Sequence, residues 1–383
     1  MTKSQSRESG YTWPMAILLV VAAVMYFGKL PDVLKGMNSN HDHSPLEVQG
    51  IVSAFCLSPI VGELLQRYNR PTLGGEGGSF TFEKDGDIEN EDYVQSSIYA
   101  LLYAMYKNSG NLTSEYGVKY QFTFNTWGIA PSPYPKEDPQ RHGKAAYAGL
   151  VTQEPALEYA KKLSKPLEIV EIGCGTGAGA NLITREVYPT ANYLALDMQQ
   201  AAINTCKQIH GTTDNPGLNC QLVPGGVGKT RNVPKNDETV DFVVISETHI
   251  ADIEIGQIER EIFGEVKRIL KPGGLFLWGN ALPTRVWQEG ADYLTKMGFE
   301  LVSNLNHTQG AVRARDEDKE RVDLAIKGLL EPYYVFNVPY FGPRCELVSE
   351  RLIANFYRHP GTALYIKMVT GYDSYMHQAW RKK

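Results

Sequence analysis

The chain has 383 residues, of which 43% are hydrophobic and 21% charged, values close to those of average globular proteins. This length allows about two domains, or one domain with large additions, and the composition excludes a disordered chain, a collagen-like repeat and a polytopic membrane protein. The net charge of −5 gives no sign of a nucleic-acid binder, which needs basic groups to replace phosphate counterions. The five cysteines form no C-x-x-C pair that would indicate zinc, and their odd number argues against a full disulfide framework. We therefore expect a reducing compartment.

An apolar run without a single charge, residues 11–28, lies near the N-terminus and has basic residues on both sides. Its length is close to the lower limit of about 17 residues for a helix that spans a bilayer. We therefore expect residues 1–35 to form a membrane anchor. A cleaved signal or transit segment and a buried soluble helix are the alternatives.

Residues 36–115 are predicted to form a polar linker followed by a helical extension. Residues 36–45 are polar, and helical periodicity follows at 46–68 and 91–108. The glycines at 74–78 lack the Lys-Ser/Thr ending of a phosphate loop, so we interpret them as a flexible turn.

Beyond Pro166, short apolar runs alternate with helical segments. The predicted strands are LEIVEIG, NYLALD, DFVVISE and GLFLWGN, and the predicted helices lie near 178–186, 200–209 and 259–270. Strands that alternate with helices predict a parallel sheet with right-handed crossovers.

A glycine-rich loop, VEIGCGTGAG at 170–179, stands between the first of these strands and the following helix. Gly173, Gly175 and Gly177 allow a tight turn and let a ligand approach main-chain N–H groups. Asp197 closes the next strand, where a carboxylate accepts hydrogen bonds from the ribose hydroxyls of a nucleotide-like ligand. A glycine-rich loop alone also fits a dinucleotide dehydrogenase. Glu171, however, is an acid where a nicotinamide-binding fingerprint usually has an apolar residue.

The pattern E-x-G-x-G-x-G resembles that of class I S-adenosylmethionine-dependent methyltransferases. Residues 241–247 resemble their fourth strand, and residues 263–276 resemble their helix, turn and fifth strand. Three further segments narrow the resemblance to the phthiotriol and glycopeptidolipid O-methyltransferases: 197–210, 361–377 and the aromatic motif FNTWG at 124–128.

This likeness covers about residues 116–383 and implies the fold class. We expect an α/β, Rossmann-like methyltransferase domain with a mixed seven-stranded sheet at 116–383. It would carry an N-terminal transmembrane helix, a helical extension and a helical cap insert at about 311–371. The implied cofactor is S-adenosyl-L-methionine, whose supply argues for a catalytic domain on the cytosolic side of an endoplasmic reticulum-like membrane.

The resemblance also assigns roles to single residues. Glu171 belongs near the amino-acid end of the cofactor and Asp197 on the ribose. Met198 belongs along the adenine, and Trp127 closes the pocket, although either side chain would also suit ordinary packing. The full predicted cofactor-binding set is Trp127, Glu171, Gly173, Gly175, Gly177, Asp197, Met198, Val227 and Glu247.

The sequence departs from the family after the third strand, where Pro224-Gly-Gly-Val227 replaces Gly-Asp-Ala. The aspartate that meets the adenine amino group is missing, so a backbone group or a water must take its place.

His249 is the candidate catalytic residue. It follows the fourth strand, where the methyl end of the cofactor should point, and a similar histidine occurs in the family. Its ordinary pKa near 6.5 suits proton abstraction from a hydroxyl. The alternative is a histidine that only packs or bonds a loop. Asp252 and Glu254 would suit a Mg²⁺-dependent mechanism, but nothing else in the sequence supports one, so no metal site is predicted.

The cap insert contains an aromatic, apolar segment at 332–341, which suits a lid over a hydrophobic acceptor or a homodimer contact. With the anchor, it favours a membrane-bound O-methyltransferase that acts on a lipophilic hydroxylated small molecule and not on nucleic acid. A C-methyltransferase on a sterol or terpene and an N-methyltransferase on a lipid amine are alternatives. A membrane-tethered scaffold that binds the cofactor without catalysis is a further one.

Overall fold

The computed structural model describes residues 124–211, 215–224, 226–227, 232–248, 256–330, 354 and 357–383. The predicted membrane anchor, linker and helical extension lie outside these residues, as does the aromatic segment of the predicted cap insert. Among the described residues, no helix is both long enough and apolar enough to span a bilayer.

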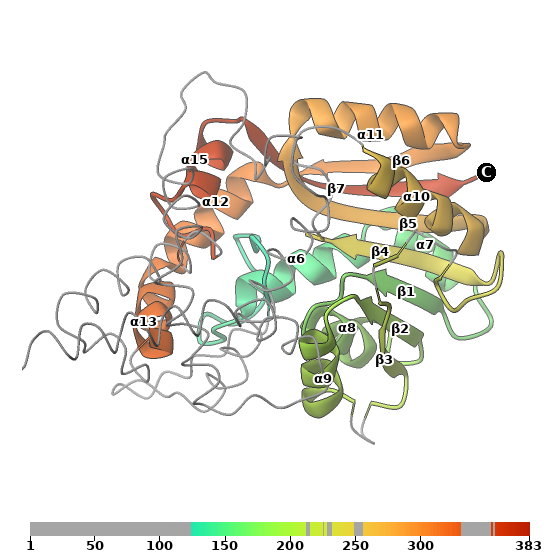
Figure 1. The fold of residues 1–383 in the computed structure, drawn as a ribbon. Helices are drawn as coiled ribbons and strands as arrows, with labels where there is room; N and C mark the ends of the chain where they lie inside the picture. Colours follow the sequence, from blue (N-terminus) through green and yellow to red (C-terminus); the bar gives the residue numbers. More distant parts are fainter. Residues whose placement is uncertain are drawn as a thin grey trace, which may run out of the picture.

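One seven-stranded sheet forms the centre of the described structure (Figure 1), with the strand order β3-β2-β1-β4-β5-β7-β6. The strands are β1 Glu168–Ile172, β2 Asn192–Asp197, β3 Leu218–Leu222, β4 Val240–Ser246, β5 Leu270–Pro283, β6 Phe299–Asn306 and β7 Asp373–Lys382. Strands β1 to β5 pair in parallel, whereas β7 runs antiparallel to both β5 and β6. The predicted mixed seven-stranded sheet is therefore confirmed.

Helices cover both faces of this sheet. They are α6 Arg141–Val151, α7 Glu154–Lys161, α8 Ala178–Leu182, the π-helix η1 Ile183–Val187, α9 Gln200–Ile209, α10 Gln257–Ile269, α11 Thr284–Lys296, α12 Thr308–Glu317, α13 Lys319–Leu330 and α15 Ala363–Val369. Consecutive strand residues point to opposite faces. In β5, Leu277 packs into the core under α6 to α9, and Trp278 packs into the core under α10 and α11. Because both faces are buried, the central strands consist mostly of apolar residues.

Helices α12, α13 and α15 lie together beside one end of the sheet (Figure 1). They fall in or next to the predicted cap insert. Two hydrogen bonds fix α12 to the start of β7: the His307 N–H donates to the Tyr375 carbonyl, and the Tyr375 N–H donates to Thr308 Oγ1. The start of β7 pairs with the end of β5. The three helices therefore stand at the carboxyl edge of the parallel strands, where α/β proteins bind their ligands.

The structure joins Cys206 of α9 to Cys220 of β3 by a disulfide bond, with the Cα atoms 6.2 Å apart. Cys174 is buried and unpaired. The cysteine count did not predict this bond, and disulfides of this kind persist mainly in oxidising compartments.

Candidate cofactor-binding site

The glycine-rich loop runs from the end of β1 to the start of α8. Gly173, Gly175 and Gly177 all have positive φ angles, of 79°, 54° and 79°. A Cβ atom at Gly173 would lie 2.1 Å from Thr248 Oγ1, and one at Gly177 would lie 2.2 Å from Cys206 Sγ. Neither contact is sterically possible, and the positive φ angles also disfavour a side chain. Both positions therefore require glycine.

Asp197 holds this loop in place from the end of β2. One carboxylate oxygen accepts the Gly175 N–H at 2.9 Å, and the other accepts the Gln199 N–H at 2.8 Å. Burial raises the pKa of Asp197, and these N–H donors partly offset that rise. A carboxylate has about four acceptor positions. With the Met198 N–H as a further donor, Asp197 still has an acceptor position for a ribose hydroxyl.

Glu171 is a fully buried acid on β1. The hydroxyl of Tyr193 donates to its Oε2 at 3.1 Å, whereas Oε1 has no hydrogen-bond partner among the described residues. Burial raises the pKa of Glu171 to about 7; the Tyr193 hydrogen bond lowers it, and the nearby Asp197 carboxylate raises it. A buried acid with an unused oxygen beside the loop is suited to a cationic group of a ligand.

Glu247 and Trp127 meet although they are far apart in the sequence. Glu247 directly follows β4, and its side chain is 3% exposed. Its Oε1 accepts the backbone N–H of Trp127 at 2.7 Å, and its Oε2 forms an ion pair with Arg358 at 2.8 Å. The Arg358 guanidinium also lies 5.8 Å from the centre of the Trp127 ring and donates to Asn125 at 2.8 Å. Glu247 therefore anchors the segment that carries Trp127.

Met198 and Val227 lie at the outer side of the site, after β2 and β3. Met198 is 43% exposed and Val227 is 9% exposed, so Met198 is not a core residue. Gly226 next to them has a φ of 81°, and a Cβ atom there would lie 4.0 Å from Met198 Sδ. A side chain in this left-handed conformation is strained. The backbone here therefore suits glycine, and an aspartate would have to adopt a conformation that is uncommon for residues with a side chain.

His249 lies outside the described residues, as do Asp252 and Glu254. Thr248, the residue before His249, is described. Its Oγ1 donates to the Ile172 carbonyl at 2.8 Å, and its own carbonyl accepts from Asn280 at 3.0 Å. The chain that leads to His249 is thus tied to the carboxyl ends of β1 and β5. Within the described part of the chain, no three acidic, histidine or cysteine side chains are grouped to hold a metal ion.

Sequence reasoning missed two partners of the site. Tyr193 could have been found, because alternation along NYLALD places it on the same face as Asp197. Arg358 had no comparable signal, since its ion pair with Glu247 joins two loops. A third polar residue, His377 of β7, is fully buried, and neither ring nitrogen has a hydrogen-bond partner among the described residues. Burial and the neighbouring His307 hold the pKa of His377 well below its usual range.

The comparison with known families identifies this region. Residues 169–274 match the family described as a methyltransferase domain. The match covers β1 to β4 and the glycine-rich loop. This part of the chain is therefore similar to methyltransferase domains, and the resemblance expected from the motifs is confirmed.

The similar curated proteins are mycobacterial methyltransferases. A phthiotriol/phenolphthiotriol dimycocerosates methyltransferase of Mycobacterium tuberculosis is 34% identical over 116 residues, which cover 30% of this chain and 38% of that protein. A fatty-acid O-methyltransferase of Mycolicibacterium smegmatis is 28% identical over 188 residues, which cover 48% of this chain and 62% of that protein. The chain thus spans less than two thirds of the length of either relative.

Among solved structures, the cyclopropane synthase MmaA2 from Mycobacterium tuberculosis aligns with a TM-score of 0.47 and 15% identity. The alignment covers 73% of this chain and 98% of that one.

Proposed function

We propose that this chain is an S-adenosylmethionine-dependent methyltransferase that transfers a methyl group to a hydroxyl of a lipophilic small molecule. The observation that carries the proposal is the glycine-rich loop, which Asp197 holds at the carboxyl edge of the sheet inside the matched methyltransferase domain. The relatives named for phthiotriol dimycocerosates and for fatty acids support a lipophilic acceptor.

The described residues fit this cofactor. Asp197 has an acceptor position for a ribose hydroxyl, the unpartnered Glu171 Oε1 suits an ammonium group, and the exposed side chain of Met198 suits an apolar contact with a base. When bound, the cofactor supplies an electrophilic methyl group on a sulfonium. Trp127 is 3% exposed and is held through Glu247, which supports a role for its segment in excluding water from the reaction.

In this proposal His249 accepts the proton of the acceptor hydroxyl as the oxygen attacks. The support is its position in the sequence directly after Thr248, which the structure ties to the ends of β1 and β5. General-base catalysis of this kind contributes about 10²–10⁴-fold to a rate.

We further propose that the protein works at a membrane to which residues 1–35 attach it as a single-pass protein. The charge-free run at 11–28 supports this. The full-length chain should sediment with membranes after a high-salt wash, and a chain without residues 1–35 should not. Equal sedimentation of the two would count against the anchor.

Two measurements test the function. Calorimetric titration of the full chain should show binding of S-adenosylmethionine and none of NADH. Transfer of labelled methyl from S-adenosylmethionine should then favour a long-chain secondary alcohol over the matching alkene and amine. Replacement of His249 by Ala should reduce that transfer by about 10²–10⁴-fold and leave cofactor affinity unchanged.

The outcomes separate the alternatives. Cofactor binding without transfer to any acceptor would favour the non-catalytic scaffold. Transfer that survives His249→Ala would favour the alkene or the amine acceptor, which needs no such base.

A further inference from the structure

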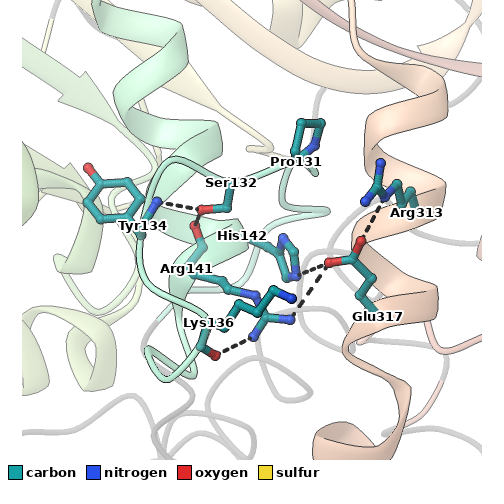
Figure 2. A pocket seen from close by; sticks show the side chains of 8 residues that line it. All are labelled: Pro131, Ser132, Tyr134, Lys136, Arg141, His142, Arg313 and Glu317. Carbon is teal, nitrogen blue, oxygen red and sulfur yellow. Dashed lines mark hydrogen bonds and ion pairs between the residues drawn. The ribbon is translucent and has the colours of Figure 1, made fainter.

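A cavity of about 380 Å³ lies between helix α12 and the segment that leads into α6 (Figure 2). Its lining shares no residue with the predicted cofactor-binding set. Basic side chains enter it from both sides: Lys136 and Arg141 from the α6 side, and Arg313 from α12. This size is within the range of pockets that bind small molecules.

The lining of this cavity carries more positive than negative charge. Among the described residues that line the cavity, Glu317 is the only carboxylate, and it faces the three cations. Arg313 donates to Glu317 at 2.7 Å, whereas Arg141 Nη2 stays 3.8 Å from it, which is beyond hydrogen-bond distance. The lining therefore keeps about two positive charges that a bound anion would neutralise.

Several N–H donors of Arg141 have no acceptor among the described residues. Its side chain is only 17% exposed. Its guanidinium makes one hydrogen bond among the described residues, from Nη1 to the Lys136 carbonyl at 3.3 Å. A guanidinium has five N–H donors, and a mostly buried one gains from an acceptor that can take two of them together.

His142 lies on the same wall, and one of its ring nitrogens has no hydrogen-bond partner among the described residues. Its side chain is 3% exposed, and its Nδ1 lies 3.2 Å from the Ile129 carbonyl. A carbonyl only accepts, so Nδ1 carries a proton, and in the neutral ring Nε2 is left as an acceptor. Nε2 has no hydrogen-bond partner among the described residues and faces a Glu317 oxygen 3.4 Å away. A proton on Nε2 would turn this contact into an ion pair with Glu317 and leave the arginine donors to a bound anion.

We propose that this cavity binds a phosphate group, either free phosphate or a phosphate monoester. A hydrogen phosphate has oxygens that accept from Arg141, Arg313 and Lys136, and its charge of about −2 matches the two positive charges that the lining keeps. A carboxylate carries only one negative charge and would neutralise only half of this excess. The site is built from residues outside the cofactor set, so the proposal does not depend on methyl transfer.

The test is calorimetric titration of the full chain at constant ionic strength. Inorganic phosphate is one probe, and the short-chain lipid dihexanoyl phosphatidate is the other. Replacement of Arg141 or Arg313 by Gln should each raise the Kd for phosphate by about 10-fold or more, because each removes a charge-assisted hydrogen bond. Arg313 is 61% exposed, so its variant should fold even if the Arg141 variant does not.

Lys319→Gln is the matched control. Lys319 of α13 is 52% exposed and pairs with the acid four residues later at 2.6 Å, as Arg313 does in α12. Its replacement should leave the Kd for phosphate unchanged. Glu317→Gln should tighten binding, because it removes the carboxylate that competes with phosphate for the same cations.

The two probes distinguish the source of the phosphate. Equal Kd values for both would identify a site for the phosphate group alone. A much lower Kd for the lipid, still raised by Arg313→Gln, would identify a phospholipid head group. If neither probe binds, or if binding survives both arginine substitutions, the proposal is wrong.

Discussion

The carboxyl group of Glu171 should make the cofactor-free protein less stable as the pH rises. Burial raises the pKa of this acid from an ordinary value of 4.5 to about 7. An acid whose pKa is higher in the folded state than in the unfolded state does not lower the free energy of unfolding at pH values below its unfolded-state pKa. The free energy of unfolding falls as the pH rises towards the folded-state pKa, and the loss is complete above that pKa. Since each pKa unit corresponds to about 1.4 kcal/mol, the expected loss in the free energy of unfolding is about 3 kcal/mol.

Urea unfolding of the native chain and of Glu171→Gln at pH 4.5 and 8.5 measures this loss. The amide cannot ionise, and its oxygen can still accept from Tyr193. Relative to the variant, the native chain should therefore lose about 3 kcal/mol between the two pH values. Glu300→Gln removes an exposed carboxylate of β6 and should follow the native chain. Equal pH dependence in the native chain and in Glu171→Gln would refute the reasoning.

The same acid should couple cofactor binding to pH. If Glu171 pairs with the ammonium group of S-adenosylmethionine, the cofactor binds the ionised form. Affinity should then increase as the pH rises from 5 towards about 7, where the pKa of the free protein lies. Glu171→Gln should bind more weakly and without this pH dependence. A variant with native affinity at pH 8 would remove Glu171 from the cofactor site.

Three further predictions concern neighbouring parts of the site. Asp197→Ala should weaken S-adenosylmethionine binding by about 2–4 kcal/mol, because two charge-assisted hydrogen bonds are lost. Calorimetry that shows native affinity for the variant would contradict the assignment of Asp197 to the ribose. The double replacement of Cys206 and Cys220 by Ser opens a loop with a sequence separation of 14 and should lower the free energy of unfolding by about 3 kcal/mol. A reductant should destabilise the native chain equally but not the variant; a native chain insensitive to reductant would show that the bond is absent. Arg358→Gln leaves a buried carboxylate without its cation and should cost about 3 kcal/mol. Hydrogen exchange at the Trp127 amide should become faster, and an unchanged rate would contradict the anchoring role.

The order of apolar residues and glycines along the sequence was sufficient to predict the parallel part of the sheet and the glycine-rich loop. Apolar runs of strand length, separated by helices, predict β1, β2, β4 and β5, because both faces of these strands are buried. The three glycines of the loop were predicted for the reason that the structure shows: a side chain at Gly173 or Gly177 would collide with a neighbouring residue.

Contacts between distant segments could not be predicted in this way. The Arg358–Glu247 ion pair and the Cys206–Cys220 bond each depend on how separate elements are placed in space, and periodicity carries no information on that. The replacement of the family's aspartate by Gly226 was visible in the sequence. Its physical reason, a positive φ, was not.

The place of β7 has a consequence for synthesis and folding. β7 lies between β5 and β6 in the sheet, although it follows both in the chain. A nascent chain that has emerged only as far as β6 therefore leaves unpaired the two strand edges that β7 later covers, one on β5 and one on β6. Such edges pair readily with other chains. We expect ribosome-bound chains stalled before residue 373 to need chaperone protection, and the arrival of β7 to end that need in a single late step.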